Sequence, residues 1–191
     1  MRESDIVTSQ RTFGAPLTIG VIADTHIYPH SRRIIPIQVI RLFQRAKIDL
    51  LIHLGDVNTR FVLEELGEIA PLIAVPGNND DDELQDMLPA SVRFTVGRFR
   101  FGAIHGHGGR SAKQVVTDTF AGKVDCALFG HSHIPYMDQK RETVLFNPGS
   151  ATDRRWHEHF GVGIISVEDI GIDPELILYT DPAHLENITF E

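Results

Sequence analysis

Short apolar runs rich in β-branched residues alternate with helical patterns in the first half of the chain. The runs at 17–23, 49–54 and 72–75 have the length of buried strands, while 34–47 and 60–69 carry apolar residues at helical spacing. Strand, helix and strand in this order predict βαβ units, whose right-handed crossovers place parallel strands side by side. The first half is therefore expected to form a parallel sheet covered by helices.

The second half follows an increasingly antiparallel pattern. The runs at 92–96 and 99–104 predict a hairpin, because a glycine such as Gly97 suits the first position of a type II′ turn. Further elements are expected in this order: a helix at 112–121 and strands at 125–129, 143–146, 163–167 and 175–179. No linker rich in Gly, Ser or Pro divides the chain, so we predict one domain over residues 16–191, preceded by an arm or extra edge segment at 1–15.

Composition and charge exclude several classes of protein. The 191 residues carry a formal charge of −8 and show no basic stripe, which argues against extensive nucleic-acid binding. The longest apolar runs are far shorter than the roughly 20 residues that cross a bilayer, so no membrane segment is expected. A single cysteine, Cys126, rules out an intramolecular disulfide, and the N-terminal residues lack the apolar stretch of a secretory signal. We therefore expect a cytoplasmic protein, and leave open whether it forms a homo-oligomer.

Five of the expected strands end in side chains that can bind a metal. These side chains are Asp24, His26, Asp56, Asn78, His105, His131 and His133. Ligands of open α/β sheets bind at the carboxyl ends of the strands, so we expect these residues to converge although they are far apart in sequence. The adjacent glycines permit the tight turns that loops around an ion require.

The expected ligands are carboxylate and amide oxygens and imidazole nitrogens, without a thiolate. This set suits Mn²⁺, Fe²⁺, Zn²⁺ or Ni²⁺ in a catalytic site and disfavours a structural zinc or an iron–sulfur cluster. Seven ligands are too many for one catalytic ion. If one carboxylate bridges, they fit two divalent ions about 3.5 to 4 Å apart, the spacing used for in-line displacement at phosphorus.

The ordered series D-x-H, G-D, G-N-x-D, H-G-H and G-H-x-H resembles the calcineurin-like metallophosphoesterase superfamily. It is most similar to the small single-domain prokaryotic phosphodiesterases, and the resemblance runs from residue 17 to the N-P-G-S segment at 147–150. It implies a four-layer αββα sandwich of two mixed β-sheets with helices on the outer faces. It also implies a small phosphate ester as substrate and two divalent ions as cofactors, with Mn²⁺ expected first.

By position, the resemblance implies that Asp24, His26 and His133 bind the first ion and that Asp56 bridges. The second ion would then be bound by Asn78, His105 and His131. A hydroxide held between the ions would attack the phosphorus in line, since metal coordination lowers the pKa of water to about 7.

The chain departs from the family pattern at Asn79. Many relatives have a histidine at this position that protonates or stabilises the leaving oxygen, whereas asparagine donates a hydrogen bond but supplies no proton at pH 7. General acid catalysis contributes roughly 10² to 10⁴-fold, so we predict a preference for diesters with good leaving groups or a substitute acid. The first candidate for that acid is His107.

Other functions and other residue roles stay open. Within enzymes, the alternatives are a phosphomonoesterase or a nucleotide pyrophosphohydrolase, and a nuclease is disfavoured because no basic groove is evident. Outside enzymes, the alternative is a protein-binding scaffold, as in the retromer subunit that resembles this fold. We expect His53 and Asp80 to stabilise the site or its turns through hydrogen bonds rather than to bind a metal. The segment 154–156, Arg-Arg-Trp, is interpreted either as a phosphate clamp with an aromatic platform or as a solvated loop or subunit contact.

Overall fold

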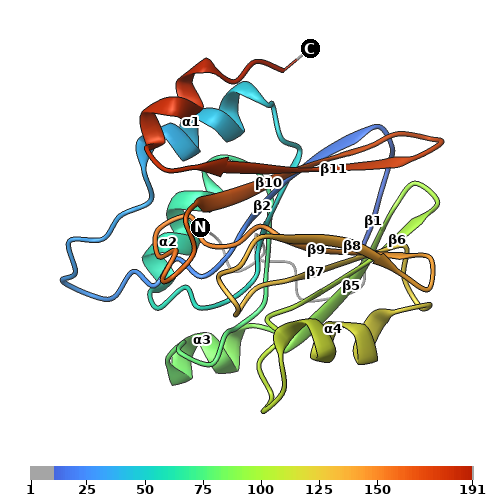
Figure 1. The fold of residues 1–191 in the computed structure, drawn as a ribbon, viewed down its shortest axis with the longest axis horizontal. Coiled ribbons are helices and arrows are strands. Elements are labelled where there is room, and N and C mark those ends of the chain that lie inside the picture. The colour runs from blue at the N-terminus through green and yellow to red at the C-terminus, as the bar shows by residue number, and fades with distance from the viewer. Residues whose placement is uncertain (1–10, 191) are drawn as a thin grey trace.

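Two mixed β-sheets pack face to face in the computed structural model, which describes residues 11–190 (Figure 1). The five-stranded sheet has the order β11 (Ile172–Tyr179), β10 (Phe160–Val167), β2 (Leu17–Ile22), β3 (Leu50–His53) and β4 (Leu72–Ala74). The six-stranded sheet has the order β1 (Thr12–Phe13), β5 (Ser91–Val96), β6 (Phe99–Ile104), β7 (Cys126–Phe129), β9 (Thr143–Asn147) and β8 (Tyr136–Lys140). The helices are α1 (Ile37–Arg45), α2 (Arg60–Gly67), α3 (Asp82–Met87), α4 (Ala112–Phe120) and the 3₁₀ helix η2 (Pro182–Asn187).

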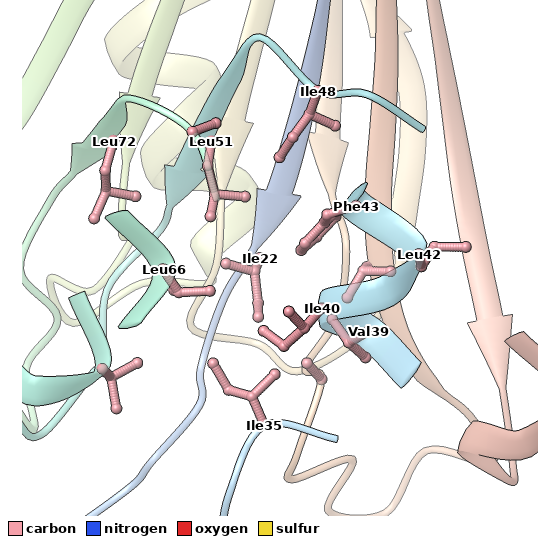
Figure 2. Packing of buried hydrophobic residues seen from close by; sticks show 14 of the residues in the cluster. Ile22, Ile35, Val39, Ile40, Leu42, Phe43, Ile48, Leu51, Leu66 and Leu72 are labelled. Carbon is pink, nitrogen blue, oxygen red and sulfur yellow. The ribbon is translucent and has the colours of Figure 1, made fainter. Parts of the chain in front are cut away.

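Three clusters of buried side chains define the layers. Between the sheets, Val21 and Ile52 of the first sheet pack with Phe101 and Phe146 of the second. On the outer face of the five-stranded sheet, apolar residues of β2, β3 and β4 meet α1 and α2 (Figure 2). On the outer face of the other sheet, the cluster that includes Val116 joins α4 to β7 and β9. The predicted αββα sandwich is therefore confirmed.

Helix α1 illustrates how the spacing of apolar residues determines the secondary structure of a predicted segment. Val39, Ile40, Leu42 and Phe43 are buried on one side of the helix and face the sheet, while its other side is exposed (Figure 2). This spacing is the apolar stripe of an amphipathic helix. The helix begins at Ile37 rather than at residue 34, because Pro36 has an extended backbone and forms its N-cap.

Two edge strands differ from the sequence-based expectations. Strand β8 was not predicted, because Tyr-Met-Asp-Gln-Lys is mostly polar and lacks the apolar run of an inner strand. It pairs with β9 at the border of the six-stranded sheet, where one edge stays exposed and polar residues are suited. At the opposite border, β1 pairs in parallel with β5. The extra edge segment is thus present at residues 12–13, and the remainder of the expected arm up to residue 10 lies outside the described residues.

The topology places the ends of inner strands from both sheets along one side of the sandwich. Strands β2, β3 and β4 run parallel, and so do β6, β7 and β9. The loops that follow these strands meet across the two sheets, since the His131 N–H donates to Oδ1 of Asp24 at 3.1 Å and Nδ1 of His105 donates to the carbonyl of Leu54 at 2.7 Å. Within the described residues, no helix has the length and apolar character that spanning a bilayer requires.

Asp80 joins the loop after β3 to the loop after β4. Its buried carboxylate accepts the backbone N–H of Asp56 at 3.1 Å and that of Gly77 at 2.7 Å on Oδ2. It also accepts the N–H of Asn58 at 2.7 Å on Oδ1. Both carboxylate oxygens of Asp80 therefore accept hydrogen bonds that hold the two loops together, which agrees with the supporting role expected for this residue.

Replacing Asp80 by Asn should lower the free energy of unfolding by about 1 to 3 kcal/mol, because at least one buried N–H loses its acceptor. Chemical denaturation measures the difference. The matched control is Asp82→Asn, since Asp82 is exposed in the first turn of α3. Equal destabilisation by the two substitutions would contradict the linking role of Asp80.

Candidate metal centre

Two groups of three potential metal ligands form where the strands of both sheets end. The first group comprises Asp24, His26 and His133, and the second comprises Asp56, His105 and His131. Within each group, one side-chain nitrogen or oxygen from every residue lies within 4.8 Å of the others. The predicted convergence of six of the seven expected ligands is therefore observed. Loops after strands of the five-stranded sheet supply Asp24, His26 and Asp56, and loops of the other sheet supply His105, His131 and His133.

The carboxylate of Asp56 is shared between the two groups. Its Oδ2 lies 3.4 Å from Nε2 of His26, which belongs to the first group. The same oxygen lies 3.5 Å from Nε2 of His105, which belongs to the second. Asp56 is 1% exposed, so this contact lies inside the protein rather than at its surface. A single buried oxygen thus faces both groups of ligands.

Backbone carbonyls orient two of the histidines. Nδ1 of His105 donates to the carbonyl of Leu54 at 2.7 Å, and Nδ1 of His133 donates to the carbonyl of Asp153. Because a carbonyl only accepts, Nδ1 carries a proton in each ring, and Nε2 faces the site. This arrangement is typical of metal-binding histidines, whose other nitrogen is commonly hydrogen-bonded.

The backbone is strained at most of the ligand positions. Asp24, His26, Asp56, His131 and His133 have φ angles of 52°, 46°, 56°, 67° and 56°. Residues other than glycine rarely occupy this left-handed region, and such residues gather at functional sites. These left-handed positions coincide with five of the six converging ligands.

Glycines make room for the ligand loops at two positions. Gly55 has a φ of 90°, and a Cβ atom there would lie 2.6 Å from Nδ1 of His105. At Gly77, a Cβ atom would lie 2.1 Å from Oδ1 of Asp56. Only glycine lets these loops approach the ligand side chains so closely.

Asp24 carries the strongest sign that a cation belongs in the site. Its Oδ2 is buried and has no hydrogen-bond partner within residues 11–190. Burial raises the pKa of Asp24 to about 8. Such an unpaired buried oxygen is costly unless a proton or a cation compensates it. Together with the surrounding imidazoles, it fits a divalent metal ion.

Four of the other five ligands favour the protonation states that bind metals. At His105, burial lowers the pKa, but the hydrogen bond with Asp56 and the charges of Asp24 and Asp56 outweigh burial and raise it. Burial raises the pKa of Asp56, but hydrogen bonds from His105 and Asn79 outweigh it and hold that pKa well below its ordinary value. Burial lowers the pKa values of His26 and His131, and that of His133 to about 4, so these rings are neutral at pH 7. Neutral imidazole and ionised carboxylate are the forms that coordinate metals.

The two asparagines after β4 occupy different positions. The Asn79 N–H donates to Oδ1 of Asp56 at 2.9 Å, and its side-chain amide donates to Oδ2 at 2.7 Å. Asn78, the expected ligand, is exposed on the same turn. The structure thus brings Asn79 rather than Asn78 into hydrogen-bond contact with the shared carboxylate. His107 lies at the rim, exposed, with its ring centre 5.5 Å from that of His105.

Residues behind the ligands fix the loops. His53 is fully buried, accepts the N–H of Gly55 on Nδ1 at 3.2 Å and donates from Nε2 to Thr25 at 3.1 Å, as its expected supporting role requires. The hydroxyl of Ser150 donates to the carbonyl of Asp24 at 2.7 Å. The N-P-G-S segment thus positions Asp24. The sequence identified this segment as part of the family pattern, but its contact with Asp24 is seen only in the structure.

Comparisons with known proteins agree with this geometry. The family model of the calcineurin-like phosphoesterase superfamily domain matches residues 17–170. A Methanocaldococcus jannaschii protein named a probable metallophosphoesterase is 34% identical over 144 residues, which cover 73% of this chain and 70% of that protein. A phosphodiesterase of the same organism is 25% identical over 146 residues, which cover 70% of this chain and 83% of the relative.

Among solved structures, Vps29 from Chaetomium thermophilum superposes with a TM-score of 0.68. It is 24% identical, and the superposition covers 86% of this chain and 98% of Vps29, which shows a common fold. The family model covers most of the chain, and the ordered ligand motifs lie inside the matched residues. This protein therefore belongs to the calcineurin-like phosphoesterase superfamily.

Proposed function

We propose that the chain is a two-metal phosphoesterase that hydrolyses phosphodiesters. The observation that carries this proposal is the shared position of Asp56 Oδ2 between His26 and His105. When bound, two divalent ions would activate water as a nucleophile and neutralise charge on the phosphoryl oxygens. Mn²⁺ is the first candidate, with Fe²⁺, Zn²⁺ or Ni²⁺ as alternatives.

The residues of the chain have separate tasks in this proposal. Asp24, His26 and His133 would bind one ion, and His105, His131 and Asn78 would bind the other, with Asp56 contacting both. Asn79 would keep the Asp56 carboxylate ionised and fixed in orientation through its two hydrogen bonds. Buried apolar residues under the ligand loops exclude water from the carboxylates, which strengthens their attraction for cations.

The lack of a proton donor at Asn79 favours esters with good leaving groups. Asn79 occupies the position from which many relatives supply a proton, so a poor leaving group would depart without that help. Diesters of acidic alcohols depend less on protonation. A relative that is 25% identical to this chain is named a phosphodiesterase, which supports the proposal that the substrate is a diester. A cytoplasmic location stays a prediction that cell fractionation tests.

The similarity to Vps29 motivates the alternative of a protein-binding scaffold. A scaffold has no need for a complete set of metal ligands, and such ligands would be free to change. Here six carboxylate and imidazole ligands converge and five of them hold strained backbones. These features favour the enzyme.

Metal-stripped protein reconstituted with Mn²⁺ should hydrolyse bis-p-nitrophenyl phosphate faster than p-nitrophenyl phosphate. Asp56→Asn should slow both reactions by at least about 100-fold, since even residues behind metal ligands contribute 10 to 100-fold. Steady-state absorbance of p-nitrophenolate measures the rates. Asp169→Asn, an exposed substitution of the same type between β10 and β11, should leave them unchanged. If neither ester is cleaved with Mn²⁺, Ni²⁺, Fe²⁺ or Zn²⁺, the scaffold is favoured instead.

His107→Ala tests whether His107 is the substitute acid. We expect hydrolysis of a diester with an alkyl leaving group to slow by roughly 100-fold or more, because general acid catalysis is lost. A p-nitrophenyl ester, which leaves readily as an anion, should slow far less. His184→Ala, on η2 and exposed, serves as the control. Equal slowing of the two esters would assign His107 another role.

Counting bound ions separates the roles of Asn78 and Asn79. Calorimetric titration with Mn²⁺ should give two ions per chain in the unmodified protein. Asn78→Ala should weaken one of them about 10 to 100-fold through loss of an amide oxygen, while Asn79→Ala should retain both. The reverse outcome would make Asn79 the ligand and Asn78 a solvated residue of the turn.

A further inference from the structure

A turn at residues 154–157 directly follows Asp153, whose carbonyl accepts a hydrogen bond from His133. The His157 N–H donates to the carbonyl of Arg154 at 2.8 Å, and the Arg154 guanidinium donates to the carbonyl of His157 at 2.6 Å. That guanidinium also lies 5.5 Å from the centre of the Phe160 ring. The side chain of Arg154 thus stabilises the turn, whereas Arg155 and Trp156, at the two central positions of the turn, are exposed to solvent.

The turn is joined to a metal-binding residue through Asp153. The carbonyl of Asp153 accepts from Nδ1 of His133, and its Oδ1 accepts the N–H of Arg155 at 3.3 Å. A hollow of about 270 Å³ separates the turn from the loop that carries His131 and His133. It is lined by Ser132, Ile134, Arg154, Arg155, Trp156 and His157. The hollow and the metal centre share one loop, because Ser132 and Ile134, which line the hollow, flank His133 in the sequence.

Arg155 supplies a positive charge that the fold leaves uncommitted. Within residues 11–190, its guanidinium makes no hydrogen bond or ion pair, unlike that of Arg154. Arg155 also has a φ of 47°, a left-handed conformation that arginine rarely adopts. In a chain of charge −8, an unpaired guanidinium that lines the hollow favours an anion there.

Trp156 is the only tryptophan of the chain and is 99% exposed. Ile134, across the hollow, is 54% exposed. A large aromatic side chain gains stability by burial, so an aromatic ring left in solvent next to a cation is typical of a surface that covers a ligand. A flat ring stacks well on an indole, whereas the guanidinium of arginine suits phosphoryl oxygens.

We propose that Arg155 and Trp156 form a substrate subsite, in which Arg155 binds a phosphoryl oxygen and Trp156 stacks on a flat organic group of the ester. The inference rests on the proposed phosphoesterase function and narrows its substrates to phosphate esters that carry an aromatic ring, such as a nucleoside. Charge complementarity selects this occupant for the hollow. A protein partner, the other conceivable occupant, would have no requirement for a phosphoryl group.

Two non-hydrolysable ligands test the subsite without turnover. Phenylphosphonate offers a phosphoryl group and a flat ring, and methylphosphonate offers the phosphoryl group alone. Calorimetry on the Mn²⁺-loaded protein should show tighter binding of phenylphosphonate, and only this ligand should change the fluorescence of Trp156. Arg155→Gln should weaken both ligands about 10 to 100-fold, the effect of losing a hydrogen bond to a charged group. Trp156→Ala should weaken phenylphosphonate roughly 5 to 100-fold and leave methylphosphonate unchanged.

Arg141→Gln is the matched control, because Arg141 also has a positive φ, of 48°, but lies in the turn between β8 and β9, which is at the far end of β9 from the metal centre. It should bind both phosphonates like the unmodified protein. Equal binding of both phosphonates by the unmodified protein, or no effect of Arg155→Gln, would overturn the subsite even if esters are hydrolysed. Conversely, ring-dependent and Arg155-dependent binding would support the subsite even if no ester is cleaved.

Discussion

The structure depends on placing two carboxylates, Asp24 and Asp56, inside the protein where two sheets meet. Asp24 is fully buried and Asp56 is 1% exposed. Transferring such groups out of water is unfavourable unless hydrogen bonds or cations compensate them. For Asp56 the compensation comes from the chain itself, through Asn79 and His105. For Asp24 it is incomplete, since Oδ2 has no partner among the described residues. This imbalance makes cation binding a property of the fold rather than of one loop.

Holding these groups together requires a rigid support. Five of the six converging ligands have left-handed backbones, each of which costs of the order of 1 to 3 kcal/mol. The core between the sheets and the helices that cover their outer faces supply apolar burial that offsets this strain. Asp80 and His53 then limit how the loops move, because each fixes backbone N–H groups close to the ligands. The centre is thus prepared before any ligand arrives, which favours tight and selective binding.

The sequence predicted the parts of the molecule that local patterns determine. Buried strands such as β2 and β3 were recognisable from their apolar runs, and the ligands at their ends followed from topology. Strand β8 was missed because pairing at an edge needs backbone hydrogen bonds rather than apolar side chains. The contact of Asn79 with Asp56 was not predicted, since the residues are 23 positions apart and the motif assigned only Asn78 to the metal. Ser150 belongs to a recognisable motif, but its role depends on a hydrogen bond to the backbone of Asp24, which is far away in the sequence. Such a role can be assigned only from the structure.

The distribution of charge connects the metal centre with the choice of substrate. A chain of charge −8 repels anions at long range, so a phosphate ester must be attracted by local positive charge. Divalent ions would provide that charge next to the phosphorus. The unpaired guanidinium of Arg155 would add positive charge in the neighbouring hollow. Because solvent screens charges beyond about 8 Å at physiological salt, only esters that reach the centre experience this attraction. Selectivity among them then depends on the organic group, and the exposed ring of Trp156 is the feature of this rim best suited to distinguish a flat group from an aliphatic one.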